Sequence, residues 1–191
     1  LDEGDDNLPS GSAVLIEGSI RDGVFFDGPE GVDGGANVGG NGVEPTVVIR
    51  PGEAAASDLT LGEVVAPGGV DEDGAELPDE PRGRGFVNDG TIQADSIFDG
   101  QESTALLIAG RDVSGTLRAV VIEGGFENTG TIQSRAYDAD TTAVVFGAGA
   151  TAEVIDNQGV ITAGSAVGLT DDGFGSDDPI ERPRSSSRRT R

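Results

Sequence analysis

Two clusters of carboxylates are the residues whose types and spacing first suggest chemistry. The segments Asp71-Glu-Asp-Gly74 and Asp171-Asp-Gly-Phe-Gly-Ser-Asp-Asp178 combine acids with glycines, and Ca²⁺ prefers carboxylate oxygens on flexible loops. The candidate metal ligands are Asp71, Asp73, Asp171 and Asp172. Neither segment has the EF-hand spacing or the nonapeptide repeat of calcium-binding β-rolls. The alternative is that both segments are solvated acidic loops.

Paired carboxylates can also hydrolyse glycosides, because one acid donates a proton while the other attacks the sugar or activates water. With 35 Asp and Glu residues, the sequence does not single out one pair. Histidine, cysteine and lysine are absent from the chain, which excludes a Ser-His-Asp triad, a thiol nucleophile and an imidazole-bound metal. No catalytic residue is therefore predicted, and we expect the chain not to be an enzyme.

One glycine-rich segment, Phe146-Gly-Ala-Gly-Ala-Thr-Ala152, imitates the GxGxxA motif of dinucleotide-binding proteins. That motif must open a helix, whose N-terminal amides bind the pyrophosphate. The residues that follow are Glu153-Val-Ile-Asp-Asn-Gln-Gly159, which read as a strand and a turn. The segment is therefore predicted to be a turn between strands, and no cofactor-binding residue is predicted.

The net charge of the chain limits the kinds of molecule that it can bind. Twelve basic residues, all arginines, stand against 35 acidic ones and give a net charge of −23. Nucleic acids and anionic membrane surfaces bind to basic faces, so both are disfavoured as partners. Aliphatic runs such as Ala119-Val-Val-Ile122 are far too short to cross a bilayer, and no direct membrane insertion is expected.

A repeated turn flanked by strands predicts the architecture. Residues 85–94 read GFVNDGTIQA, residues 125–134 read GFENTGTIQS, and residues 155–163 repeat the pattern more loosely. The aligned turn residues are Asn88, Gly90, Asn128, Gly130, Asn157 and Gly159. On both sides of the turn, apolar and polar residues alternate as they do in strands. The apolar positions predicted to form the core are Phe86, Ile92, Phe126, Ile132, Ile155 and Ile161.

Asn-x-Gly favours a turn because glycine accepts a positive φ and asparagine bonds nearby backbone. Such a turn could close an antiparallel hairpin. The short strands and the recurrence favour stacked parallel coils instead, in which the asparagines form a hydrogen-bonded ladder. Residues 104–108 and 142–146 repeat at 38 residues and the first two turns at 40. We interpret that interval as two coils of about 20 residues each, which predicts about seven or eight coils.

The chain is divided by composition into three parts. Residues 1–11 are a polar lead-in, and residues 12–169 form a β-solenoid domain. Loop insertions are expected near 23–43, which contains eight glycines, and near 67–85, which contains an acidic run and three prolines. Residues 170–191 are an acidic and then arginine-rich tail or linker.

The pattern GxxxNxGTIxA, followed by TALLIAG or TAVVFGAGA and another NxGxI, resembles the passenger regions of bacterial autotransporters and related haemagglutinin-like surface proteins. The resemblance covers about residues 85–165, with a fainter match at 12–23. It implies an all-β fold, a right-handed parallel β-helix, displayed outside a Gram-negative cell.

The function expected from these observations is a non-catalytic extracellular module that is structural or adhesive and self-assembles into a layer or filament. Its expected partners are copies of itself or cell-surface polymers. No cofactor is expected, and calcium is the candidate ion. The alternative is a polysaccharide-active β-helix enzyme, either a hydrolase or a lyase. Exposed aromatic platforms beside paired carboxylates would favour that alternative, whereas Phe86, Phe126 and Phe146 are claimed by the core pattern.

Overall fold

The computed structural model describes residues 11–27, 35–41, 43–62 and 84–166, and their regular structure is entirely β-strand. The strands are short runs rich in Val, Ile, Leu and Thr, which suit a pleated surface with one buried face. No helix occurs among these described residues. The prediction of an all-β fold is confirmed.

Four parallel sheets and one hairpin contain the strands. Sheet A consists of β1 (Val14–Ile16), β4 (Val47–Ile49), β8 (Ser103–Ile108) and β14 (Thr141–Phe146). Sheet B consists of β5 (Leu59–Leu61), β11 (Val120–Ile122) and β15 (Ala150–Ala152). Sheet C consists of β2 (Val24–Phe26), β6 (Phe86–Asn88), β12 (Phe126–Asn128) and β16 (Ile155–Asn157). Sheet D consists of β3 (Asn37–Gly40), β7 (Thr91–Asp99), β13 (Thr131–Tyr137) and β17 (Val160–Ala166). The antiparallel hairpin pairs β9 (Arg111–Val113) with β10 (Thr116–Arg118).

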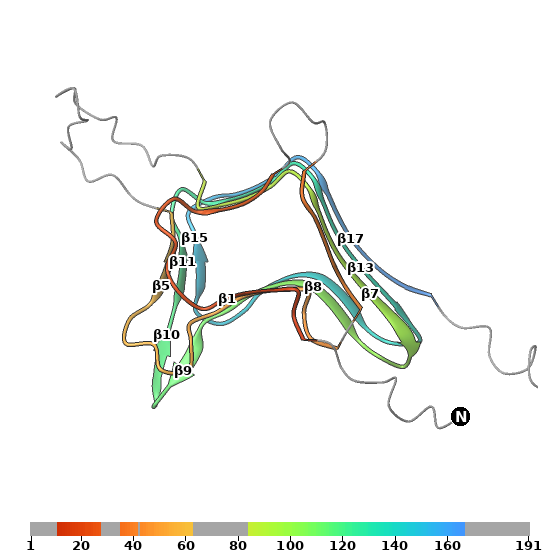
Figure 1. Ribbon diagram of the computed structural model, residues 1–191, viewed down its shortest axis with the longest axis horizontal. Coiled ribbons are helices and arrows are strands. Elements are labelled where there is room, and N and C mark those ends of the chain that lie inside the picture. The colour runs from red at the N-terminus through yellow and green to blue at the C-terminus, as the bar shows by residue number, and fades with distance from the viewer. Residues whose placement is uncertain (1–10, 28–34, 42, 63–83, 167–191) are drawn as a thin grey trace, which may run out of the picture.

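The chain passes through sheets A, B, C and D in that order and then returns to sheet A. We call one such circuit a coil, and the described residues make four coils, which begin at β1, β4, β8 and β14. In the first coil the place of a sheet B strand is taken by Ile20, which forms a single parallel bridge to Leu61. Strands of successive coils lie over one another along each side of the stack (Figure 1). This parallel arrangement is compatible with a β-solenoid.

The predicted coil length is wrong by a factor of two. Ile92 pairs directly with Ile132, and Leu106 pairs directly with Val144, so an interval of 38–40 residues is one coil and not two. Each coil is long because it has four sides, and the third coil also carries the β9–β10 hairpin. With paired strands about 4.8 Å apart, the four coils span only about 15 Å between the first and the last strand layers.

The glycine-rich segment 23–43, which was predicted to be a loop insertion, supplies β2 and β3 to the first coil. Val24 pairs with Phe86, and Val38 pairs with Ile92, so both strands extend the main columns of side chains. The prediction is therefore wrong for these strands. The lead-in up to residue 10, most of the insertion at 67–85 and the tail at 170–191 lie outside the described residues.

The core is a set of columns in which equivalent side chains of successive coils pack on each other. Phe86 and Phe126 are fully buried, and their rings stack with centroids 4.8 Å apart. Ile92 and Ile132 are also fully buried, as predicted. The two remaining predicted core residues, given with their exposed fractions, are Ile155 at 58% and Ile161 at 40%. They belong to the fourth coil, over which no further described coil lies, so the prediction that they are buried is wrong.

The Asn-x-Gly corners stack through their backbones. The Thr131 N–H donates to the Gly90 carbonyl at 2.8 Å, and the Val160 N–H donates to the Gly130 carbonyl at 2.8 Å. A Cβ added to Gly130 would lie 2.1 Å from the Gly90 oxygen, and one on Gly159 would lie 2.1 Å from the Gly130 oxygen. None of these three glycines has a φ in the left-handed region. Glycine is therefore required here for close backbone approach, and the expectation of a positive φ is wrong.

Substituting Gly130→Ala should lower the thermal unfolding midpoint, because the new Cβ forces two corners apart. Overpacking of this kind costs about 1–3 kcal/mol, which for a chain of this size corresponds to a fall of about 3–10 °C. Gly164→Ala, in β17, is the matched control, since a Cβ there meets no atom within 4 Å. Equal midpoints for the two variants, measured by circular dichroism, would contradict the stacked corner.

Candidate functional site

The asparagines of the three corners form a ladder of side-chain hydrogen bonds. Asn88 Nδ2 donates to Asn128 Oδ1 at 2.7 Å, and Asn128 Nδ2 donates to Asn157 Oδ1 at 2.7 Å. Backbone pairing places the three residues in the same column of sheet C. Asn88 and Asn128 are fully buried, so each hydrogen bond satisfies polar atoms that water cannot reach. The alignment of the three sequence segments predicts this arrangement.

The ladder is interrupted at one end and open at the other. In the first coil the equivalent position is Phe26, which offers no polar side chain, and Asn88 Oδ1 is buried without a hydrogen-bond partner. At the other end, Asn157 is exposed. The sequence signal that places Phe26 in this column is weak, since its segment has neither the asparagine nor the spacing of the other three.

A second polar ladder lies on the outward face of sheet D. Gln133 Nε2 donates to Gln93 Oε1 at 2.5 Å, and Gln93 Nε2 contacts the Asp95 carboxylate. Arg135 Nη2 donates to Gln133 Oε1 at 3.3 Å. The Gln133–Gln93 bond joins adjacent coils, whereas the other two contacts each join residues of a single strand, β7 or β13.

An arginine bridges the acidic column of sheet C. Glu127 pairs with Asp156 in the strand register, so two carboxylates lie on adjacent coils. Arg84 Nε lies 3.3 Å from Glu127 and Arg84 Nη2 lies 3.7 Å from Asp156. Arg84 Nη1 also donates to the Gly124 carbonyl at 2.9 Å. One cation therefore offsets the repulsion between two stacked acids, and the cluster has a structural explanation.

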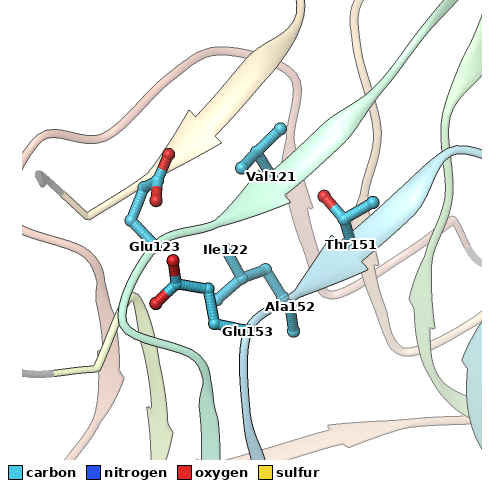
Figure 2. A pocket seen from close by; sticks show the side chains of 6 residues that line it. All are labelled: Val121, Ile122, Glu123, Thr151, Ala152 and Glu153. Carbon is cyan, nitrogen blue, oxygen red and sulfur yellow. The ribbon is translucent and has the colours of Figure 1, made fainter.

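A shallow pocket lies between β11 and β15 and is lined by two acids, Glu123 and Glu153, that have no ion pair with a described residue. Its volume is about 210 Å³, and it is lined by Val121, Ile122, Glu123, Thr151, Ala152 and Glu153. Glu123 and Glu153 follow the paired residues Ile122 and Ala152, so they occupy equivalent positions on adjacent coils. Figure 2 shows both carboxylates on one side of the pocket and the aliphatic groups of Val121 and Ala152 beside them. Sequence reasoning missed this pair because the register between the two strands had to be known first.

The remaining predicted sites are not brought together by the described structure. The calcium candidates Asp71, Asp73, Asp171 and Asp172 lie outside the described residues. Within the described part of the chain, no group of three or more acids is placed to hold a metal ion. The segment 146–152 runs from the end of β14 to the end of β15 without a helix, as predicted for a turn between strands. No helix of the described residues is long and apolar enough to cross a membrane.

Removing the middle rung of the asparagine ladder should cost more than removing the last one. Asn128→Ala removes both 2.7 Å bonds of the ladder and leaves the buried Asn88 Nδ2 with the Gly90 and Thr131 carbonyls at 3.4 Å. A buried polar group that loses its partner costs about 1–3 kcal/mol. Asn157→Ala removes only the bond that Asn128 Nδ2 donates, and truncating this exposed side chain lets water reach that amide, so its effect should be smaller. Chemical denaturation measures both differences. An equal or larger loss for Asn157→Ala would contradict the buried ladder.

No protein-family model, curated protein or solved structure matches this chain. The similarity to autotransporter passengers therefore rests on the short repeat motifs.

Proposed function

We propose that the chain is a non-catalytic structural or adhesive module, built as a right-handed parallel β-helix and displayed outside a Gram-negative cell. The observation that carries the proposal is that the polar side chains buried between coils serve the stacking itself. The asparagine ladder binds coil to coil at 2.7 Å in both of its steps. A fold whose coils are joined by buried amides in this way provides a stiff support for surface loops.

The outer surface supports the same function. The net charge of −23 keeps the surface hydrated and disfavours nonspecific adsorption to nucleic acids. The absence of cysteine suits a protein that is exported through an oxidising envelope. Copies of the chain and cell-surface polymers are the proposed partners, and the acidic segments outside the described residues are the proposed calcium ligands.

The Glu123 and Glu153 pocket favours the second candidate, a polysaccharide-active enzyme. Glu123 and Glu153 lie on adjacent coils, and a pair of carboxylates is the catalytic arrangement of most glycosidases. The pocket volume of about 210 Å³ is, however, below the roughly 300–1,000 Å³ of typical ligand sites. No aromatic side chain lines it, although sugar sites commonly use aromatic platforms. The pocket therefore supports the enzymatic candidate less well than the ladders support the structural one.

Incubating the purified chain with a panel of neutral and acidic polysaccharides should release no new reducing ends and no unsaturated products. Binding of the same polymers is measured in parallel by co-sedimentation. Turnover that is lost in Glu123→Gln and Glu153→Gln, but kept in Asp112→Asn on the exposed hairpin, would overturn the structural proposal in favour of the enzyme.

A further inference from the structure

The fourth coil presents an apolar end surface, which we call the C-terminal face and define by Phe146, Val154, Ile155, Val160 and Ile161. Ile155 pairs with the fully buried Phe126, and Ile161 pairs with the fully buried Ile132. Both nevertheless remain exposed, at 58% and 40%. What distinguishes them from their partners is the absence of a described coil on one side. Another coil packed on this face would bury both side chains, as the inner coils bury Phe126 and Ile132.

The strands at the two ends of the stack are edge strands of the same parallel sheets. β14, β15, β16 and β17 form one edge, and β1, β2 and β3 form the other in sheets A, C and D. Edge strands carry unpaired N–H and C=O groups that act as templates for another chain. The first coil placed on the fourth coil of another copy would continue these sheets with the parallel direction that they already have.

The charges at the two ends are complementary in the corner column that follows sheet B. Ile20 bridges to Leu61, Leu61 pairs with Ile122, and Ile122 pairs with Ala152. The residues that follow the two ends of this column are Arg21 in the first coil and Glu153 in the fourth. Stacking a second copy in register therefore brings Glu153 of one copy next to Arg21 of the other, with opposite charges.

A similar match holds for the outward column of sheet A. Leu15 pairs with Val48, Val48 pairs with Leu107, and Leu107 pairs with Val145. Leu15 is half exposed at the end of this aliphatic column. The same stacking places Leu15 over Val145 and continues the column across the junction.

We propose that a second copy of this chain binds the C-terminal face head to tail, with its first coil on the fourth coil of its neighbour. The proposal rests on the structural function given above and names the partner and the surface for it. Such an interface joins two different surfaces at opposite ends of the stack, and because each added copy continues the stacking direction, it yields a linear filament and not a ring. The net charge of −23 opposes association, and added salt should therefore promote growth by screening repulsion.

The first test measures the mass of the full chain by light scattering at increasing protein and salt concentrations. The wild-type mass should rise several-fold and show no fixed upper value. Ile161→Asp, which places a charge on the C-terminal face, should stay monomeric. Tyr137→Asp is the matched control, because Tyr137 is 50% exposed but lies on the third coil away from this face, and it should assemble like the wild type. Thermal melts establish that both variants are folded.

The second test examines the polarity of the contact. Arg21→Glu and Glu153→Arg should each weaken assembly, and the double variant, which exchanges the two charges, should restore it. Ile161→Asp keeps its first coil intact, so a small fraction of it added to wild type should cap filaments and lower their mean mass.

Three results would overturn the proposal. They are a wild-type monomer under all these conditions, growth that stops at a dimer, and equal behaviour of Ile161→Asp and Tyr137→Asp. A monomer that is also inactive on polysaccharides would overturn this inference and leave the proposed function standing. Turnover of a polysaccharide would instead overturn the proposed function, whatever the state of assembly.

Discussion

The rest of the structure depends on the contact between successive Asn-x-Gly corners. The amide ladder of Asn88, Asn128 and Asn157 fixes the register of sheet C, and the bare Gly90, Gly130 and Gly159 backbones let the coils approach. Side chains alternate between the two faces of a strand, so a shift of one residue would move every apolar side chain out of the core. A ladder of polar groups is sensitive to such a shift, because a buried amide without a partner is costly. The corners therefore specify the register that apolar packing alone would hold loosely.

This register explains why the surface and the ends differ in character. Along the sides of the stack, equivalent polar residues meet each other, and Gln93 with Gln133 or Arg84 with two stacked acids become cohesive contacts. At the end of the fourth coil, the same columns present apolar groups with no described neighbour. In a repeat architecture the coils are thus joined by polar contacts along the sides, and the end of the stack is suited to packing against a further coil. The proposed scaffold function and the proposed filament contact both follow from that asymmetry.

The parts of the fold that could be predicted from the sequence are those marked by a short residue pattern, namely the Asn-x-Gly turn with apolar residues on both sides. Phe86 and Phe126 stand in two nearly identical segments, GFVNDGTIQA and GFENTGTIQS, so the residues that align in the sequence also pair in the structure. The number of coils was not predictable, because a period counts residues and does not show how many sides a coil has. Phe26 carries no asparagine signal, so its strand was missed. Ile161 has the pattern of a core residue, but its burial depends on a neighbouring layer, which no local pattern reveals.

The central claim is that the two repeat segments 40 residues apart lie on adjacent coils in register, and the cysteine-free chain allows a direct measurement by disulfide formation. Gln93 and Gln133 pair on adjacent strands, whereas Gln93 and Thr162 are two strands apart. Adjacent strands put the Cα atoms about 4.8 Å apart, within the range of about 4.4–6.8 Å that a disulfide spans. Mild oxidation should therefore cross-link Q93C/Q133C rapidly and leave Q93C/T162C, at about 10 Å, reduced. No cross-link in Q93C/Q133C, or equal rates in both pairs, would contradict the account.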